Sequence, residues 1–365
     1  MASSSVAKPS VSARLESHEA DEMTDLDKHV LALFKQLVAS AERQTEEDAP
    51  TPGLGSSKEA ELQADTTIIF SASSAVKNAV AEIQQLCPAL DKSDELEVYL
   101  TSLWETFILV AKSIPSDSPL QDELVAVLQC LRSRAKATIE VWGEQARLWR
   151  DLPLFSAMVR EAWYDPDPMA MEKTSIEEYA SILVEWINLN AFSARIMEKG
   201  LLQWTLYAVM AVGAALERYP PPLSPIMESD MEGEDETVEG IEESEQIKEE
   251  ARMYFECQVS VACQWILLSG SEIFRDAFHQ KTLNETELAS TNPGPLYKED
   301  GRGKPGLNMD RWRFWQKRFA EIGSDEAKRA AQHMEDIVRE DDRVIVRRLG
   351  TAEEDGKSGG VVKDT

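Results

Sequence analysis

Cysteine and histidine are scarce in this sequence, which has four of each among its 365 residues. The cysteines, at positions 87, 130, 257 and 263, form no C-x-x-C pair and follow no regular spacing. This usage argues against a disulfide scaffold and against a cysteine-based zinc site. It is typical of reduced thiols that are buried as small hydrophobic side chains in an intracellular protein.

Signatures of catalysis and of metal binding are also missing. The chain contains no H-E-x-x-H motif and no P-loop. The Gly-rich stretch at 301–306 is not preceded by a predicted strand, as a phosphate-binding loop requires. Glu272, Asp276 and His279 share one helical face, but a di-metal carboxylate bundle needs E-x-x-H pairs on two helices. We therefore expect no cofactor, no metal ion and no identifiable catalytic residue.

Cationic residues are in the minority, because 66 acidic against 38 basic side chains give a formal net charge of −28 at pH 7. Such a chain would repel phosphate backbones, so we expect no binding of nucleic acid. Between Glu228 and Glu250 the chain has twelve acidic residues and one lysine. Like charges at this density cannot bury enough surface to fold, which predicts an acidic disordered loop at 223–246. We expect the stretch 228–250 to contact a basic protein partner.

A long hydrophobic run is absent as well. The most apolar segment, residues 201–216, includes Gln203 and is shorter than the about 20 residues needed to cross a bilayer. A helix that is buried on all sides gives the same pattern. The first 22 residues have no apolar stretch of the kind found in secretory signals. These features predict a chain without a membrane span, located in the cytoplasm or in the nucleus.

Most of the remaining sequence has the spacing of amphipathic helices. Period-two strands and alternating βαβ patterns are missing, so the sequence predicts an all-α protein with an irregular multi-helix bundle. We expect disordered tails at 1–22 and 341–365. Between them we expect a single helical domain at 23–340, interrupted by a Pro/Gly/Ser-rich linker at 44–61 and by the acidic loop.

One of the predicted helices is expected to carry two tryptophans. It begins near Ser118, and its apolar stripe passes through Leu124 and Leu131. The pattern predicts that this helix continues to the region of Trp142 and Trp149.

The decamer DRWRFWQKRF at 310–319 concentrates aromatic rings and cations in this acidic chain. On a helix, one apolar face is formed by residues at positions i, i+3, i+7 and i+10: Trp312, Trp315, Phe319 and Ile322. Its cations either point away from that face, as Arg313 and Lys317 do, or flank it, as Arg311 and Arg318 do. A nucleic-acid-binding helix would instead carry aromatic and cationic side chains interleaved on one exposed face. We expect an amphipathic helix that docks by its tryptophan face, with a partner-binding face as the alternative.

The segment GKPGLNMDRWRFWQKRF, residues 303–319, resembles the terminal motif of a family of fungal proteins, domain of unknown function 3632. That motif runs Gly-Lys-Pro-Gly, a short cap, then Arg-Trp-x-Phe-Trp-x-x-Arg-Phe. GPLYK before the segment and ERYPPP at 217–222 also fit the family. The resemblance is strongest over 293–335 and diffuse over 62–281. It implies an all-helical intracellular protein, and it assigns no catalytic or binding residue.

The function that these features favour is protein binding. A packed, tryptophan-rich helical bundle without a reactive centre predicts a non-enzymatic interaction or scaffold module. The alternative is a helical protein or enzyme that binds an apolar small molecule. In that case the tryptophans, together with Met158, Met197 and Met210, would line a cavity.

Overall fold

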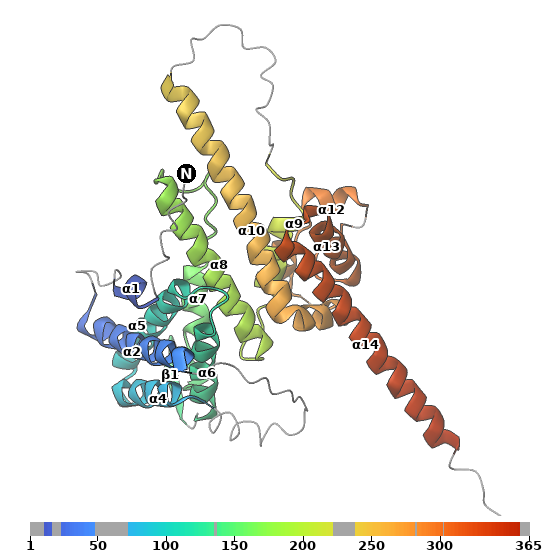
Figure 1. Ribbon diagram of the computed structural model, residues 1–365. Coiled ribbons are helices and arrows are strands. Elements are labelled where there is room, and N and C mark those ends of the chain that lie inside the picture. Colours follow the sequence, from blue (N-terminus) through green and yellow to red (C-terminus); the bar gives the residue numbers. More distant parts are fainter. Residues whose placement is uncertain are drawn as a thin grey trace, which may run out of the picture. The chain divides into compact units, whose positions relative to one another are not determined.

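The fold is known over the residues that the computed structural model describes: 11–16, 23–47, 72–134, 137–221, 238–281, 283–301 and 303–357. Residue contacts divide the chain into two compact units, Met1–Leu201 and Leu202–Thr365. Both units are built from helices, and the described residues form a single two-stranded sheet (Figure 1). The predicted all-α class is therefore confirmed. The predicted domain at 23–340 spans both units, and each unit is described by itself.

The first unit packs its elements around α5. In chain order these elements are α1 (Val11–Glu16), α2 (Asp25–Glu47), α4 (Ser74–Leu86), α5 (Ser93–Ser113), α6 (Leu120–Ser133), β1 (Thr138–Val141), β2 (Glu144–Arg147), α7 (Phe155–Ala162) and α8 (Ile176–Glu198). Helix α5 contacts α2, α7, α8 and β1. Its Phe107 lies edge-on to Phe34, and its Trp104 lies edge-on to Phe155. These rings form an aromatic core on the buried face of α5.

A β-hairpin replaces the second half of the helix that the sequence predicted at 118–149. Helix α6 ends at Ser133, and two antiparallel strands follow. The two residues between the strands, Trp142 and Gly143, have φ angles of 52° and 76°. Positive φ at both central residues is the geometry of a type I′ turn, whose twist matches that of the paired strands. The prediction that strands are missing is therefore wrong at 138–147.

Polar side chains that are buried in the first unit form hydrogen bonds within it. Gln121 of α6 donates from its amide nitrogen to the carbonyl oxygens of Ile114 and Asn188, at 3.0 and 3.1 Å. Its amide oxygen accepts from Arg195 of α8 at 2.9 Å. Buried polar groups destabilise a fold unless they are hydrogen-bonded, so these contacts fix α6 against α8.

The second unit packs around α10. Its elements are α9 (Thr205–Leu216), α10 (Val238–Phe278), α11 (Glu285–Ser290), α12 (Pro295–Glu299), α13 (Met309–Ile322) and α14 (Asp325–Lys357). Helices α9, α13 and α14 all contact α10. Ser260 and Gln264 of α10 donate to Glu326 at the start of α14, at 3.0 and 2.9 Å. Further along, a Cβ on Gly270 would lie 2.9 Å from Ile337, so the glycine allows the two helices to pack closely.

Four helices occupy parts of segments that the sequence predicted to lack helices. Helix α1 lies within the predicted tail at 1–22, α2 ends inside the predicted linker at 44–61, α10 begins inside the predicted loop at 223–246, and α14 continues into the predicted tail at 341–365. Once a helix is anchored by packing, each further residue adds a backbone hydrogen bond, so the helix propagates into charged sequence. The rest of these segments, and the predicted linker at 44–61 beyond the end of α2, lie outside the described residues.

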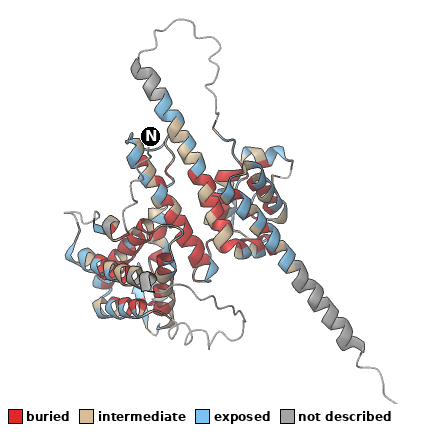
Figure 2. Cartoon of the chain, in the orientation of Figure 1, coloured by how far each residue is buried: buried red, intermediate tan, exposed pale blue. Residues whose placement is uncertain are grey.

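Apolar residues are buried mainly where helices of the same unit face one another (Figure 2). Of the nine tryptophans, Trp142 alone is exposed. The most apolar segment forms α9, which is shorter than the predicted run at 201–216. Among the described helices, none is both long and apolar enough to cross a membrane.

Candidate functional site

The decamer at 310–319 forms most of α13. Asn308 caps this helix, because its side-chain oxygen accepts from the backbone N–H of Arg311 at 3.0 Å. Trp312, Trp315 and Phe319 are each 0% exposed. The helix therefore docks by its tryptophan face, as the periodicity predicted.

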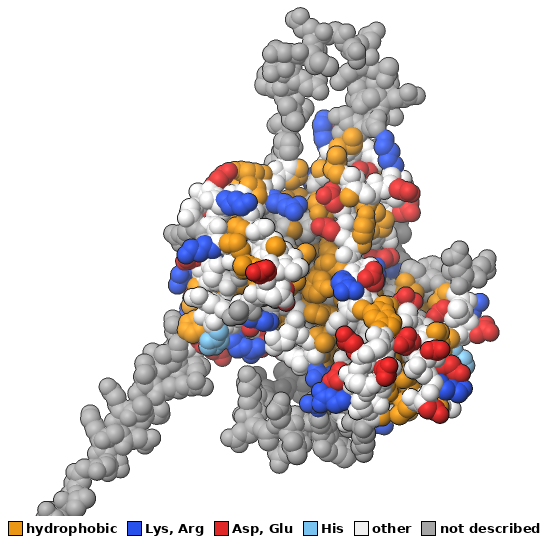
Figure 3. Space-filling model, turned by 180° about the vertical axis from the view of Figure 1, so that it is seen from behind, with side chains coloured by type: hydrophobic (Ala, Val, Ile, Leu, Met, Phe, Trp, Pro, Cys, Tyr) orange, Lys and Arg blue, Asp and Glu red, His pale blue; other side chains and the backbone are white. Residues whose placement is uncertain are grey.

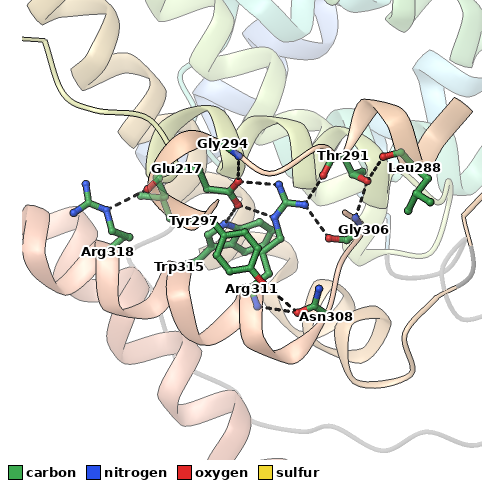
Figure 4. A network of polar contacts seen from close by, with 11 residues as sticks. Glu217, Leu288, Thr291, Gly294, Tyr297, Gly306, Asn308, Arg311, Trp315 and Arg318 are labelled. Carbon is green, nitrogen blue, oxygen red and sulfur yellow. Dashed lines mark hydrogen bonds and ion pairs between the residues drawn. The ribbon is translucent and has the colours of Figure 1, made fainter. Parts of the chain in front are cut away.

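Arg311, predicted to flank the tryptophan face, is itself buried and meets an acidic residue. It is 1% exposed, and its partner Glu217, which directly follows α9, is 0% exposed. The Arg311 Nε and Nη2 atoms donate to the two carboxylate oxygens of Glu217 at 2.6 and 3.0 Å (Figure 4). This bidentate pair joins residues that lie 94 positions apart in the sequence.

The third nitrogen of the Arg311 guanidinium also has partners. Nη1 donates to the carbonyl oxygens of Thr291 and Gly306, at 2.7 and 2.8 Å. The guanidinium carbon lies 5.7 Å from the ring centroid of Tyr297 and 5.4 Å from that of Trp315. Both rings therefore lie within the range of a cation–π interaction.

The Glu217 carboxylate accepts two further hydrogen bonds. The indole N–H of Trp315 donates to Oε1 at 2.7 Å, and the backbone N–H of Gly294 donates to Oε2 at 2.7 Å. The Glu217 carbonyl oxygen accepts from the backbone N–H of Leu296 at 3.0 Å. A Cβ on Gly294 would lie 2.5 Å from that carbonyl oxygen, so only glycine permits this approach.

We call these residues the Arg311 cluster: Glu217, Thr291, Gly294, Gly306, Arg311 and Trp315. The cluster ties the end of α9, the segment around α11 and α12, and α13 into one body (Figure 4). Arg318 adds a hydrogen bond from Nε to the Leu216 carbonyl oxygen at 3.2 Å. A buried ion pair stabilises a fold only when further hydrogen bonds satisfy it, and here they do. The chemistry of the cluster therefore supports a structural role, with its charged atoms engaged inside the protein.

The Gly-rich stretch GRGKPG at 301–306 serves the same cluster. It has G-x-G-x-x-G spacing but follows helix α12 rather than a strand. A Cβ on Gly303 would lie 2.8 Å from the Lys298 Cα atom, and Gly306 has φ +84°. The backbone N–H of Gly306 donates to the Thr291 hydroxyl at 2.9 Å. Close packing and positive φ thus explain these glycines without a phosphate ligand.

Side chains of the polar helical face predicted at Glu272, Asp276 and His279 contact other residues of the second unit. Glu272 pairs with Arg275, and Asp276 accepts from the Thr205 hydroxyl at 2.5 Å. The described residues contain no group of three or more His, Cys, Asp or Glu side chains that could hold a metal ion.

All four cysteines are free thiols, and three of them are buried. Burial raises the pKa of the partly exposed Cys87 to about 11. Burial also raises the pKa of Cys263 well above its ordinary value. Because the thiolate is the reactive form, these cysteines are poor nucleophiles.

Two hollows open on the surface of the second unit. One, of about 400 Å³, lies beside the start of α13, with Lys281 and Lys304 in its wall. The other, of about 540 Å³, lies between α13 and α14 and is lined largely by polar side chains. Neither hollow is lined by a tryptophan or by a methionine that the small-molecule alternative names.

The two-residue turn of the hairpin in the first unit presents an indole to solvent. Trp142 is 58% exposed, and within the described part of the chain its indole makes no hydrogen bond and no ring contact. Its backbone N–H donates to the Glu97 carboxylate of α5 at 2.7 Å. A non-glycine residue with left-handed backbone costs about 1–3 kcal/mol and persists where the surrounding structure holds it. We call Trp142 and Gly143, with the carboxylate of Glu97, the Trp142 turn.

Carboxylates lie on the residues next to the Trp142 turn. Glu140 and Glu144, two residues to either side of Trp142, are exposed, and Glu97 is half-buried. Glu140 accepts from the amide nitrogen of Gln145 at 3.0 Å. Within the described residues, none of the three glutamates forms an ion pair. Acidic side chains are frequent elsewhere on the first unit too, over the lobe that includes α2 and α4 (Figure 3).

The acidic stretch 228–250, which the sequence singled out for a basic partner, is described only from Val238, where α10 begins. In its last turns, Lys248 pairs with Glu245. Arg252, just beyond it, pairs with both Glu249 and Glu256 at 2.6 Å. Part of the negative charge is thus neutralised on the helix itself.

Comparison with known proteins matches the chain to one family. The family model described as "Protein of unknown function (DUF3632)" matches residues 104–319, which is more than half of the chain. The match begins in α5 and ends in α13, so it includes Trp142 and Gly143 and the whole Arg311 cluster, whereas Glu97 precedes it. No curated protein and no solved structure matches the chain.

Proposed function

From the premise that this chain belongs to the DUF3632 family, we propose that it is a non-enzymatic module that binds another protein through the Trp142 turn. The proposal places the module in the cytoplasm or in the nucleus, where free thiols such as its four cysteines stay reduced.

The exposure of Trp142 is the observation that carries this proposal. Tryptophan is the residue type most enriched among side chains that dominate binding energy at protein interfaces. The other eight tryptophans are buried or half-buried, so the fold uses indoles as core material everywhere else. An indole that is held out on a strained turn, with no internal partner, supports a role in contact with another molecule.

The Arg311 cluster supports the same proposal from the second unit. Its ion pair, its indole N–H and the carbonyl oxygens around it are engaged with one another. This is the arrangement expected of a scaffold that holds its helices in a fixed relation and offers its outer surface for binding.

Site-specific photo-crosslinking tests the proposal. A photoreactive amino acid is placed at exposed Gln145 on the hairpin, and the protein is irradiated in an extract of the source organism. The matched control carries the same group at Met169, which is 85% exposed in the same unit. We expect one discrete protein adduct from position 145, lost when Trp142→Asn is added, and none from position 169.

Equal labelling from both positions, or an adduct that persists with Trp142→Asn, would contradict the proposal. The Asn substitution is suited to this test because Asn-Gly is the preferred pair for a type I′ turn. The hairpin is therefore retained while the indole is removed.

A further inference from the structure

We propose that the partner segment recognised by the Trp142 turn is basic, with a lysine or arginine side chain stacked on the indole. This inference rests on the proposed function and adds the chemistry of the partner. The acceptor site consists of the Trp142 ring and the carboxylates of Glu97, Glu140 and Glu144.

The turn itself does not require tryptophan at position 142. A type I′ turn favours Asn or Asp followed by Gly, since these residues adopt positive φ most readily. Here the Gly is present at 143, with φ 76°, while a bulky aromatic residue occupies the first position at φ 52°. Neither the backbone nor the core uses the indole, so its ring is available to a ligand.

The ring and its neighbours together suit a cation. The face of an indole attracts ammonium and guanidinium groups more strongly than that of any other aromatic side chain. The position of Glu97 is fixed beside the turn by the hydrogen bond from the Trp142 N–H. Glu140 and Glu144 stand on the strands at either side of the turn. In the register of the hairpin, Glu140 lies opposite Gln145 and Glu144 opposite Val141, so each face of the hairpin presents one carboxylate beside the turn.

Other occupants fit this surface less well. An apolar partner surface would remove three carboxylates from water without supplying donors to them. An acidic partner would face these same carboxylates and a chain of net charge −28. The net negative charge of the chain attracts a basic segment from a distance and raises its association rate. At the turn, the cations of that segment meet an aromatic ring and carboxylates, so the contact is favourable as well.

Binding of defined peptides to the full-length chain tests the inference. The probe is an unstructured peptide of Lys, Arg, Gly and Ser, and its twin has every cation replaced by Gln. Affinity is measured by calorimetry across a series of salt concentrations. We expect the basic peptide to bind with salt-sensitive affinity and the Gln twin to bind at least tenfold more weakly.

Two sets of variants locate the site. Trp142→Asn is expected to lower affinity for the basic peptide about tenfold, whereas Trp142→Phe, which retains a ring, lowers it less. A variant with Gln at positions 97, 140 and 144 is expected to lower affinity and to reduce the salt dependence. The control variant has Gln in place of the exposed Glu172, Glu177 and Glu178, which changes the net charge equally. It is expected to bind the peptide within twofold of wild type.

Two outcomes would overturn the inference. If the control charge variant weakens binding as much as the turn variant does, the peptide responds only to net charge. If the basic peptide fails to bind while Trp142→Asn still abolishes the crosslinked adduct from position 145, the partner is of another chemistry. In that second case the proposed function stands and this inference alone fails.

Discussion

The molecule uses tryptophan in two opposite ways, in two segments that look alike in sequence. EVWGEQARLW at 140–149 and DRWRFWQKRF at 310–319 each combine two tryptophans with several charged side chains. In α13 both indoles are completely buried, and even Arg311 is drawn into the interior. In the hairpin, Trp149 is buried at 5% exposure while Trp142 stands in solvent.

The two segments differ in the partners available to the charged residues beside their tryptophans. Arg311 finds Glu217 and two carbonyl oxygens inside the second unit, so burial of the pair satisfies its donors. The glutamates at the hairpin meet no cation among the described residues, so they stay in water and keep the turn at the surface. A tryptophan-rich, charged segment thus becomes core or surface according to the partners of its charges.

Removing the buried cation should produce the largest effect. Arg311→Met leaves the Glu217 carboxylate buried without its counter-charge and is expected to cost about 3–5 kcal/mol of stability in the second unit. Hydrogen exchange of α13 measures this, because a chain of two units need not unfold in one step. The control is Arg313→Met, whose exposed side chain should change stability by less than about 0.5 kcal/mol. Equal effects of the two substitutions would show that the Arg311 pair is unimportant.

The two buried indoles of α13 should differ from each other. The Trp315 N–H donates to Glu217, whereas the Trp312 N–H has no partner within the described residues. Trp315→Phe therefore loses volume and a hydrogen bond to a charged group, which is worth about 1.5–3 kcal/mol. Trp312→Phe loses volume alone and should cost less by that amount. The same exchange measurement on α13 compares them, and equal costs would argue against a stabilising role for this hydrogen bond.

The hydrogen bonds made by Asn308 and Glu97 to the backbones of the two segments should contribute less to stability. Asn308→Ala removes the N-cap of α13 and is expected to cost about 1 kcal/mol. Glu97→Ala removes a half-buried acceptor from the Trp142 N–H, which water replaces, and should cost less than about 0.5 kcal/mol. Exchange rates near residues 309–312 and 138–147 report each effect locally. If Glu97→Ala cost more stability than Asn308→Ala, the predicted order of these two contributions would be wrong.

Substitution of the exposed Trp142 should have the smallest effect on stability, and it should raise stability rather than lower it. Trp142→Asn replaces a residue with unfavourable positive φ by one that suits the turn, and it removes no core contact. It is expected to raise the stability of the first unit by about 0.5–1 kcal/mol. Hydrogen exchange of the amides at 138–147 checks this, because it reports on the first unit alone. A marked loss of stability would show that the indole packs against the protein.

The helices were the most predictable part of the fold. The spacing of apolar residues indicated the helical class and the tryptophan face of α13, because an amphipathic helix buries one continuous stripe. The hairpin was missed because its strands have only four residues each. Trp142 and Trp149 also fall seven residues apart, which matches a helical repeat. The Trp-Gly pair between two short alternating runs was the available signal, and it lacks the usual Asn or Asp.

The Arg311 cluster was not predictable from local pattern. An arginine beside an apolar stripe normally lies at the surface, as Arg313 does, so position on the helix gave no sign of burial. Its partner Glu217 is 94 residues away, beyond the reach of any periodicity argument. The Gly-Pro at 294–295 and the glycines at 301–306 were visible in the sequence, but only the packing shows why these positions require glycine.

Hydroxyl-radical footprinting read by mass spectrometry tests the contrast between the two segments most directly, since it reports the solvent exposure of individual tryptophans in the intact chain. We predict that Trp142 is oxidised rapidly, while Trp312 and Trp315 are oxidised only once the protein is unfolded. Protection of Trp142 equal to that of the α13 pair, or rapid oxidation of either α13 indole, would contradict the account.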